Sequence, residues 1–131
     1  MPSVLFVCVA NSFRSQMAEA AAKALGGAAW EVWSAGSHPG GRVHPLAMEL
    51  MREAGYDLSA HRSKGLDEVP AREWDYVVTM GCGDACPTVR ARQRLDWNLP
   101  DPAALPPREA RAARDRIIEL VRGVVSPTPR S

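Results

Sequence analysis

The sequence lacks the features that send a chain into a membrane or out of the cell. Residues 1–3 lead directly into a short apolar run, without a basic leader, a membrane-spanning stretch or a small-residue cleavage site. The formal net charge is only +1, so the chain also lacks the excess of one sign that favours nucleic acid or anionic lipid. We therefore expect a cytoplasmic protein with no nucleic-acid or membrane partner, and we expect a monomer.

The chain also has few cysteines and no metal-binding pattern. Three cysteines in a reducing compartment do not make a disulfide framework, which leaves the thiols for chemistry. Neither a Cys-x2-Cys pair nor a paired-histidine motif occurs, so we expect no metal centre of that kind. The histidines at 38, 44 and 61 are expected to be surface or capping residues.

Short apolar runs alternate along the chain with stretches of helical spacing. Runs typical of strands lie at 4–7, 30–36, 76–80 and 94–99, and helical periodicity marks 16–25, 44–54 and 106–125. This alternation predicts one α/β domain over 1–125, with three α/β/α layers around a four-stranded parallel sheet. Residues 126–131 are polar and proline-rich, and we expect a disordered tail there. Ser63 is expected to cap a short helix.

Cys8 stands where the first predicted strand ends and the first helix begins. Backbone N–H groups converge at such a turn, and the helix dipole adds partial positive charge, so the turn suits an oxyanion of phosphate size. The Ser15 hydroxyl and the Arg14 guanidinium add donors that would favour a thiolate. The alternative is a buried structural cysteine at a strand end, but that leaves the spacing of Arg14 and Ser15 unexplained.

The spacing Cys8-x5-Arg14-Ser15 resembles the phosphate-binding loop of the low-molecular-weight phosphatase family. Asn11 falls where this family has an asparagine that shapes the loop, and Ser12 with residues 16–19 resembles the branch that contains the arsenate reductases. The resemblance covers nearly the whole chain and implies the family's flavodoxin-like fold. It further implies that Cys8 is the nucleophile, that Arg14 holds the oxyanion, and that the oxyanion-binding loop comprises Val9, Ala10, Asn11, Ser12, Phe13, Arg14 and Ser15.

Two loop positions depart from the family's pattern. Ala10 stands where relatives more often carry His or Gly, and Phe13 where they more often carry Ala or Cys. We expect the bulky ring of Phe13 to alter access to the anion site or the shape of the loop.

Three residues later in the chain separate two activities. Asp101, in the dipeptide Asp101-Pro102, matches the family's catalytic aspartate, which protonates the leaving oxygen of a phosphate ester and then activates water. Cys82 and Cys86 follow the third predicted strand, whose carboxyl end faces the same sheet edge as Cys8. A phosphatase needs neither thiol. An arsenate reductase uses one of them to release arsenite and the other to resolve the disulfide that forms.

The sequence thus favours an arsenate reductase of the thioredoxin-coupled type, which converts arsenate to arsenite by a three-cysteine relay and has residual phosphatase activity. The alternatives are a protein-tyrosine or phosphate-ester phosphatase, and a non-catalytic sensor that binds arsenite or oxyanions through its thiols. We expect no tightly bound cofactor. Thioredoxin is the expected reductant, with glutaredoxin plus glutathione or another thiol left open. A potassium ion, which some relatives bind, is also left open.

Overall fold

The computed structural model describes residues 2–80, 89–99 and 102–125. Two of the three cysteines, Cys82 and Cys86, lie outside these ranges. Asp101 and the predicted tail, 126–131, also lie outside them. The roles assigned to these residues therefore stay predictions.

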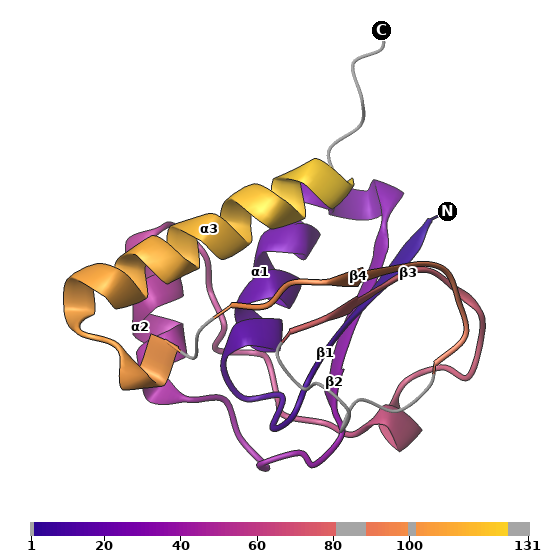
Figure 1. Cartoon of the computed structure of the whole chain (residues 1–131), viewed down its shortest axis with the longest axis horizontal. Coiled ribbons are helices and arrows are strands. Elements are labelled where there is room, and N and C mark those ends of the chain that lie inside the picture. The colour runs from indigo at the N-terminus through magenta and orange to yellow at the C-terminus, as the bar shows by residue number, and fades with distance from the viewer. Residues whose placement is uncertain (1, 81–88, 100–101, 126–131) are drawn as a thin grey trace, which may run out of the picture.

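A four-stranded parallel sheet forms the centre of the fold (Figure 1). Its strands are β1 (Ser3–Cys8), β2 (Glu31–Gly36), β3 (Trp74–Thr79) and β4 (Ala91–Asp96), in the order β2-β1-β3-β4. Every pairing is parallel, as predicted. β4 begins and ends three residues earlier than expected, since it was predicted at 94–99. The reason is that an exposed edge strand pairs through its main chain and does not need the apolar residues by which a strand is recognised in the sequence.

Three α-helices cover one face of the sheet, and Figure 1 shows them grouped together. They are α1 (Arg14–Gly26), α2 (Pro45–Glu53) and α3 (Pro107–Val125), close to their predicted bounds. Met17, Leu50 and Ile117, one from each helix, share a buried cluster with Val4 and Phe6 of β1. Along the described ranges, no helix is both long and apolar enough to cross a membrane.

The opposite face of the sheet packs a smaller cluster. Leu5 and Val7 of β1 lie there with Trp74 of β3, and Leu66 packs against them. β1 is therefore buried on both faces, which explains its continuous apolar sequence. Three short 3₁₀-helices complete the described secondary structure: η1 (Gly27–Ala29), η2 (Leu66–Glu68) and η4 (Pro102–Ala104).

α1 is buried along most of its length, and its buried residues include polar ones. Gln16 and Glu19 are buried beside several alanines. The helix ends at Gly27, which has φ +58° and donates its N–H to the carbonyl of Lys23, as a C-terminal glycine cap does. Polar groups inside a core need hydrogen-bond partners, and those of Gln16 and Glu19 lie around the loop after β1.

The carboxyl ends of the strands meet at one edge of the sheet. Cys8 pairs with Gly36 of β2, and Val7 pairs with Thr79 of β3. The loops that follow β1 and β2 leave from this edge and are joined by backbone hydrogen bonds. Open α/β sheets bind their ligands at this end of the strands.

Candidate active site

The loop after β1 turns its carbonyl groups outward. Four of them accept backbone N–H groups from 37–44 at 2.8–3.2 Å, namely those of Cys8, Val9, Ala10 and Ser12. The Asn11 carbonyl accepts the Gln16 side chain at 3.1 Å, and the Phe13 carbonyl accepts the Met17 N–H at 3.0 Å. In a trans peptide the C=O points away from the following N–H. The N–H groups of residues 9–14 therefore turn toward the centre of the loop and form a concave nest suited to an anion.

Gly36, at the end of β2, holds this loop from outside. A Cβ on this residue would lie 2.5 Å from the carbonyl oxygen of Val9, closer than a real Cβ comes to another atom. Only glycine therefore fits here without moving the loop.

Ser63 holds the loop at a second point. Its hydroxyl donates to the carbonyl of Ala10 at 2.8 Å. The helix-capping role predicted for Ser63 is therefore wrong. η2 begins instead after Gly65, whose N–H donates to the Glu68 carboxylate at 2.8 Å. The Ala10 carbonyl thus accepts two hydrogen bonds, one from the Gly40 N–H and one from Ser63.

Cys8 lies at a small pocket over the loop. Its Sγ is 2.8 Å from the Oγ of Ser15 in the first turn of α1. The pocket has a volume of about 120 Å³ and is lined by Cys8, Val9, Ala10, Ser12, Phe13 and Arg14. Pockets for drug-sized ligands measure roughly 300–1,000 Å³, so these walls suit a small anion.

Asn11 takes up a backbone conformation that few residues tolerate. Its φ is +50°, the only positive φ of a non-glycine residue in the described ranges, and asparagine is among the side chains that adopt this region most readily. The side-chain oxygen accepts the Gln16 Nε2 and the backbone N–H of Lys64, both at 2.9 Å. These two donors fix which end of the amide faces the loop.

The other end of the Asn11 amide sets the direction of the hydrogen bonds around the sulfur. Nδ2 donates to the Oγ of Ser15 at 2.8 Å and to the Oγ of Ser34 at 3.0 Å. Because the Ser15 oxygen accepts from Asn11, its own proton is directed at the Cys8 sulfur. In the same way the Ser34 proton is directed at Glu19, with which Ser34 forms a short hydrogen bond.

Arg14 lies beside the pocket at the first position of α1. One guanidinium nitrogen donates to the carbonyl of Leu99 at 2.7 Å. The guanidinium has further N–H groups in a planar fork, a geometry that can bind two oxygens of an oxyanion. The bond also ties Arg14 to the stretch just before Asp101, which itself lies outside the described residues.

Phe13, which departs from the family's pattern, packs its ring against His44. The ring is only 5% exposed and packs on the ring of His44, with centroids 4.9 Å apart. His44 caps α2, because its Nδ1 accepts the Leu46 N–H at 3.0 Å, so its predicted capping role is confirmed. Phe13 thus lines the pocket while its ring fills space between the loop and α2.

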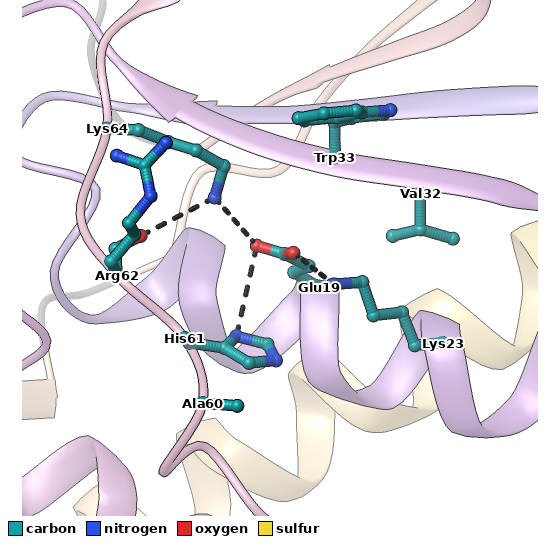
Figure 2. Close-up of a pocket in the computed structure, with 8 residues that line it drawn as sticks. All are labelled: Glu19, Lys23, Val32, Trp33, Ala60, His61, Arg62 and Lys64. Atoms are coloured by element: carbon teal, nitrogen blue, oxygen red, sulfur yellow. Dashed lines mark hydrogen bonds and ion pairs between the residues drawn. The ribbon is translucent and has the colours of Figure 1, made fainter. Parts of the chain in front are cut away.

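A polar cluster contacts the loop through Asn11, and Figure 2 shows the charged residues of this cluster. Glu19 of α1 accepts Lys23 at 2.7 Å on one oxygen and Lys64 at 3.3 Å on the other, which also binds Ser34. Next to it, His61 Nδ1 lies 2.9 Å from the side-chain oxygen of Gln16. Our sequence analysis did not find this cluster. The available signal was a glutamate within the apolar spacing of a helix rich in alanine.

The charges in this cluster shift two pKa values. Burial raises the pKa of Glu19, but hydrogen bonds from Lys23 and Ser34 and the charge of Lys64 outweigh burial and hold the pKa below its usual range. Burial lowers the pKa of His61, against the charge of Glu19. At neutral pH, Glu19 is therefore ionised and His61 neutral. His61 is neither a capping nor a fully exposed residue, because it packs against α1.

The structure thus brings together Cys8, Arg14 and the loop between them. In the described part of the chain, no three His, Cys, Asp or Glu side chains are grouped to hold a metal. Cys82, Cys86 and Asp101 fall outside it, so their distances to Cys8 remain undescribed. The sequence did not predict the residues that support the loop, which are Gln16, Glu19, Ser63 and Lys64.

Comparison with known proteins identifies the family. The family model described as low molecular weight phosphotyrosine protein phosphatase matches residues 3–127. A curated relative, the glutaredoxin arsenate reductase of Synechocystis sp., is 37% identical over 129 residues, which cover 96% of this chain and 98% of the relative.

Solved structures agree with this match. The structure of an arsenate reductase in the phosphate binding state has a TM-score of 0.86 at 37% identity. The match covers 95% of this chain and 97% of that reductase. The thioredoxin-dependent arsenate reductase of Corynebacterium glutamicum has a TM-score of 0.76 at 35% identity. The match covers 95% of this chain and 60% of the Corynebacterium chain. The predicted α/β fold with a four-stranded parallel sheet is therefore confirmed.

Proposed function

Because the chain belongs to the low molecular weight phosphotyrosine protein phosphatase family and is similar in sequence and structure to arsenate reductases, we propose that it reduces arsenate to arsenite. The observation that carries the proposal is the nest of inward N–H groups between Cys8 and Arg14. A tetrahedral oxyanion is the ligand that such a nest fits best. A structural relative is described in a phosphate-bound state, which supports an oxyanion ligand here.

In the first step, the Cys8 thiolate attacks arsenic and displaces one arsenate hydroxyl group, which takes up a proton from solvent and leaves as water. Arg14 and the N–H groups of the loop hold the remaining oxygens and balance the charge that develops on them. The product is an arsenic(V) thioester on Cys8.

In the second step, the thiolate of Cys82 attacks the Cys8 sulfur. The electron pair of the sulfur–arsenic bond moves to arsenic, which leaves as arsenite, and a Cys8–Cys82 disulfide forms. Cys86 then attacks Cys82, which frees Cys8 and leaves a Cys82–Cys86 disulfide. Two thiols have then supplied the two electrons that arsenic gained.

An external dithiol must reduce the final disulfide. We propose thioredoxin, since a structural relative is described as thioredoxin-dependent. A glutaredoxin system is the alternative, because a curated relative carries that name.

Phosphate-ester hydrolysis is the second candidate activity, because the matching family is named for phosphotyrosine phosphatases. It would use Cys8 and Arg14 in the same way, with Asp101 as the acid that protonates the leaving oxygen. The small pocket formed by the described residues suits the phosphate group of such an ester as well as a free oxyanion.

The deciding experiment measures arsenite released from arsenate by the purified protein. Thioredoxin with its reductase and glutaredoxin with glutathione are supplied in separate reactions. We expect catalytic release with thioredoxin and none from Cys8→Ser. Hydrolysis of phosphotyrosine without arsenate reduction by any donor would establish the phosphatase instead, and arsenite binding without turnover would establish a sensor.

A further inference from the structure

Lys64 is a buried cation directly beneath the oxyanion loop. The residue is 6% exposed, in the segment between α2 and η2. Its backbone N–H donates to the side chain of Asn11, and its carbonyl accepts the N–H of Gly36 at 2.9 Å. The main chain of Lys64 therefore contacts two residues that shape the loop.

The ammonium of Lys64 lies where several oxygen atoms converge, as Figure 2 shows in part. Its Nζ is 3.3 Å from Glu19 Oε1, 3.5 Å from Ser34 Oγ and 3.5 Å from the Arg62 carbonyl oxygen. A carboxylate, a hydroxyl and a carbonyl are also the donors by which proteins bind hard cations. An ammonium with three N–H donors satisfies the same set.

These residues do not fit an additional potassium ion. The converging oxygens already contact the ammonium of Lys64, and the other oxygen of Glu19 binds Lys23. The adjoining cavity of about 230 Å³ is lined by the cations Lys23, Arg62 and Lys64, by neutral His61, and by one carboxylate, that of Glu19. A further cation would face repulsion there.

We propose that the Lys64 ammonium is a built-in monovalent cation, which fixes the hydrogen-bond direction of the oxyanion loop and makes the protein independent of potassium. It is a positioning residue, since it contacts Glu19 and Ser34 and not the oxyanion. With Glu19 held as an anion, Ser34 donates to Glu19 and accepts from Asn11. Asn11 in turn orients Ser15 against the Cys8 sulfur.

The native protein and Lys64→Ala should respond differently to monovalent cations. In the native protein, exchanging potassium for sodium or tetramethylammonium at constant ionic strength leaves the rate of Cys8 alkylation by iodoacetamide unchanged, and Tm as well. Lys64→Ala opens the oxygen cage to solvent. That variant loses about tenfold in alkylation rate in tetramethylammonium, as substitutions behind a reacting site do, and both its rate and Tm recover saturably with potassium or methylammonium.

The alkylation is measured with Cys82 and Cys86 both replaced by serine, so that only Cys8 reacts. This readout needs no arsenate turnover, and so it tests the role of Lys64 even if another oxyanion is the substrate. Lys23→Ala is the matched control. It removes an equal charge from Glu19, but its side chain is half exposed, so water replaces it and no cation dependence appears.

Several results would overturn the proposal. Saturable stabilisation of the native protein by potassium would show that an ion binds beside Lys64. A Lys64→Ala protein with native alkylation in every salt would remove the positioning role. Equal behaviour of Lys23→Ala and Lys64→Ala would mean that only the net charge near Glu19 matters. If Lys64→Ala does not fold, the salt series on the native protein and on the larger replacement Lys64→Met still decides, because Lys64→Met must lose reactivity without potassium rescue.

Discussion

At the scale of single residues, the proposed chemistry rests on Cys8 and Arg14. Cys8→Ser should abolish arsenate reduction and any phosphatase turnover, because a hydroxyl has no comparable anionic form at neutral pH. Arg14→Lys should lose about a hundredfold or more in kcat/KM, because an ammonium cannot present a planar fork to two oxygens. Arsenite release and phosphate-ester hydrolysis measure both effects. Turnover by Cys8→Ser, or near-native rates in Arg14→Lys, would contradict the assignment.

A substitution at Gly36 would test how closely β2 approaches the loop after β1. Gly36→Ala places a Cβ against the Val9 carbonyl and should lower the free energy of unfolding by about 1–3 kcal/mol. It should also weaken phosphate binding, since the loop must move. The control is Gly123→Ala in α3, where a Cβ meets nothing and the change should stabilise by about 0.4–1 kcal/mol. Urea unfolding measures both variants, and a Gly36→Ala protein as stable as this control would refute the close approach.

The sequence predicted the residues whose spacing is local. Cys8, Asn11, Arg14 and Ser15 lie within one turn and one helix start, so their order along the chain is enough to recognise an anion site. Lys64 could not be found in this way, because its partners Glu19 and Ser34 come from α1 and β2. Nothing in the sequence near Lys64 indicates that it is buried.

At the scale of elements, Arg114 joins α3 to α2. Its guanidinium is nearly buried and donates to the Leu50 carbonyl and to Glu53, both at 2.9 Å. Arg114→Ala should therefore lower the free energy of unfolding by about 1–3 kcal/mol, because a buried carbonyl loses a donor. Arg111 binds the same Glu53 from a half-exposed position, so Arg111→Ala should change stability little. Equal losses in the two variants, measured by thermal unfolding, would contradict this distinction.

The sequence predicted the elements themselves well where apolar periodicity is strong. α1, α2 and α3 each have a helical apolar spacing and begin and end within two residues of prediction. The bounds of β4 were predicted wrongly because its residues, Ala91–Asp96, are mostly exposed and polar. Main-chain pairing with β3 determines where this strand lies. Arg114 is buried within α3, although an arginine usually lies in solvent, and a carboxylate on α2, that of Glu53, pairs with it.

At the scale of the whole molecule, His61 couples stability to pH. Burial lowers its pKa in the folded protein from the usual 6.5. Below pH 6.5 the His61 imidazole is protonated in the unfolded chain but stays neutral in the folded protein. The free energy of unfolding therefore falls, by at most about 1.4 kcal/mol per pH unit. The lowered pKa of Glu19 adds a loss below 4.5, where the unfolded carboxylate protonates first.

Urea unfolding at a series of pH values checks this expectation. His61→Gln remains neutral and can still donate to Gln16, so it should lose less stability than the native protein as the pH falls below 6.5. The two proteins should differ little at neutral pH. An unchanged slope in the variant would assign the acid sensitivity to other groups.

The proposed relay can be tested step by step, because it assigns each thiol a different task. Cys86→Ser should release one arsenite per molecule and stop as a Cys8–Cys82 disulfide, whereas Cys82→Ser should stall with arsenic on Cys8. Phosphatase turnover, if present, should survive in both. Mass spectrometry with peptide mapping after one equivalent of arsenate identifies the bridged pair. Continuous turnover of Cys86→Ser with glutathione and glutaredoxin would remove Cys86 from the relay.

β4 leaves one edge of the sheet without a further strand among the described residues, and this has a consequence for behaviour in concentrated solution. Open strand edges pair readily with other chains and are a common origin of aggregation. β4 carries exposed Arg92 and Arg94, so a second copy that paired along this edge in parallel and in register would bring like charges together. The charges that hide β4 from recognition in the sequence thus protect the protein from its own copies.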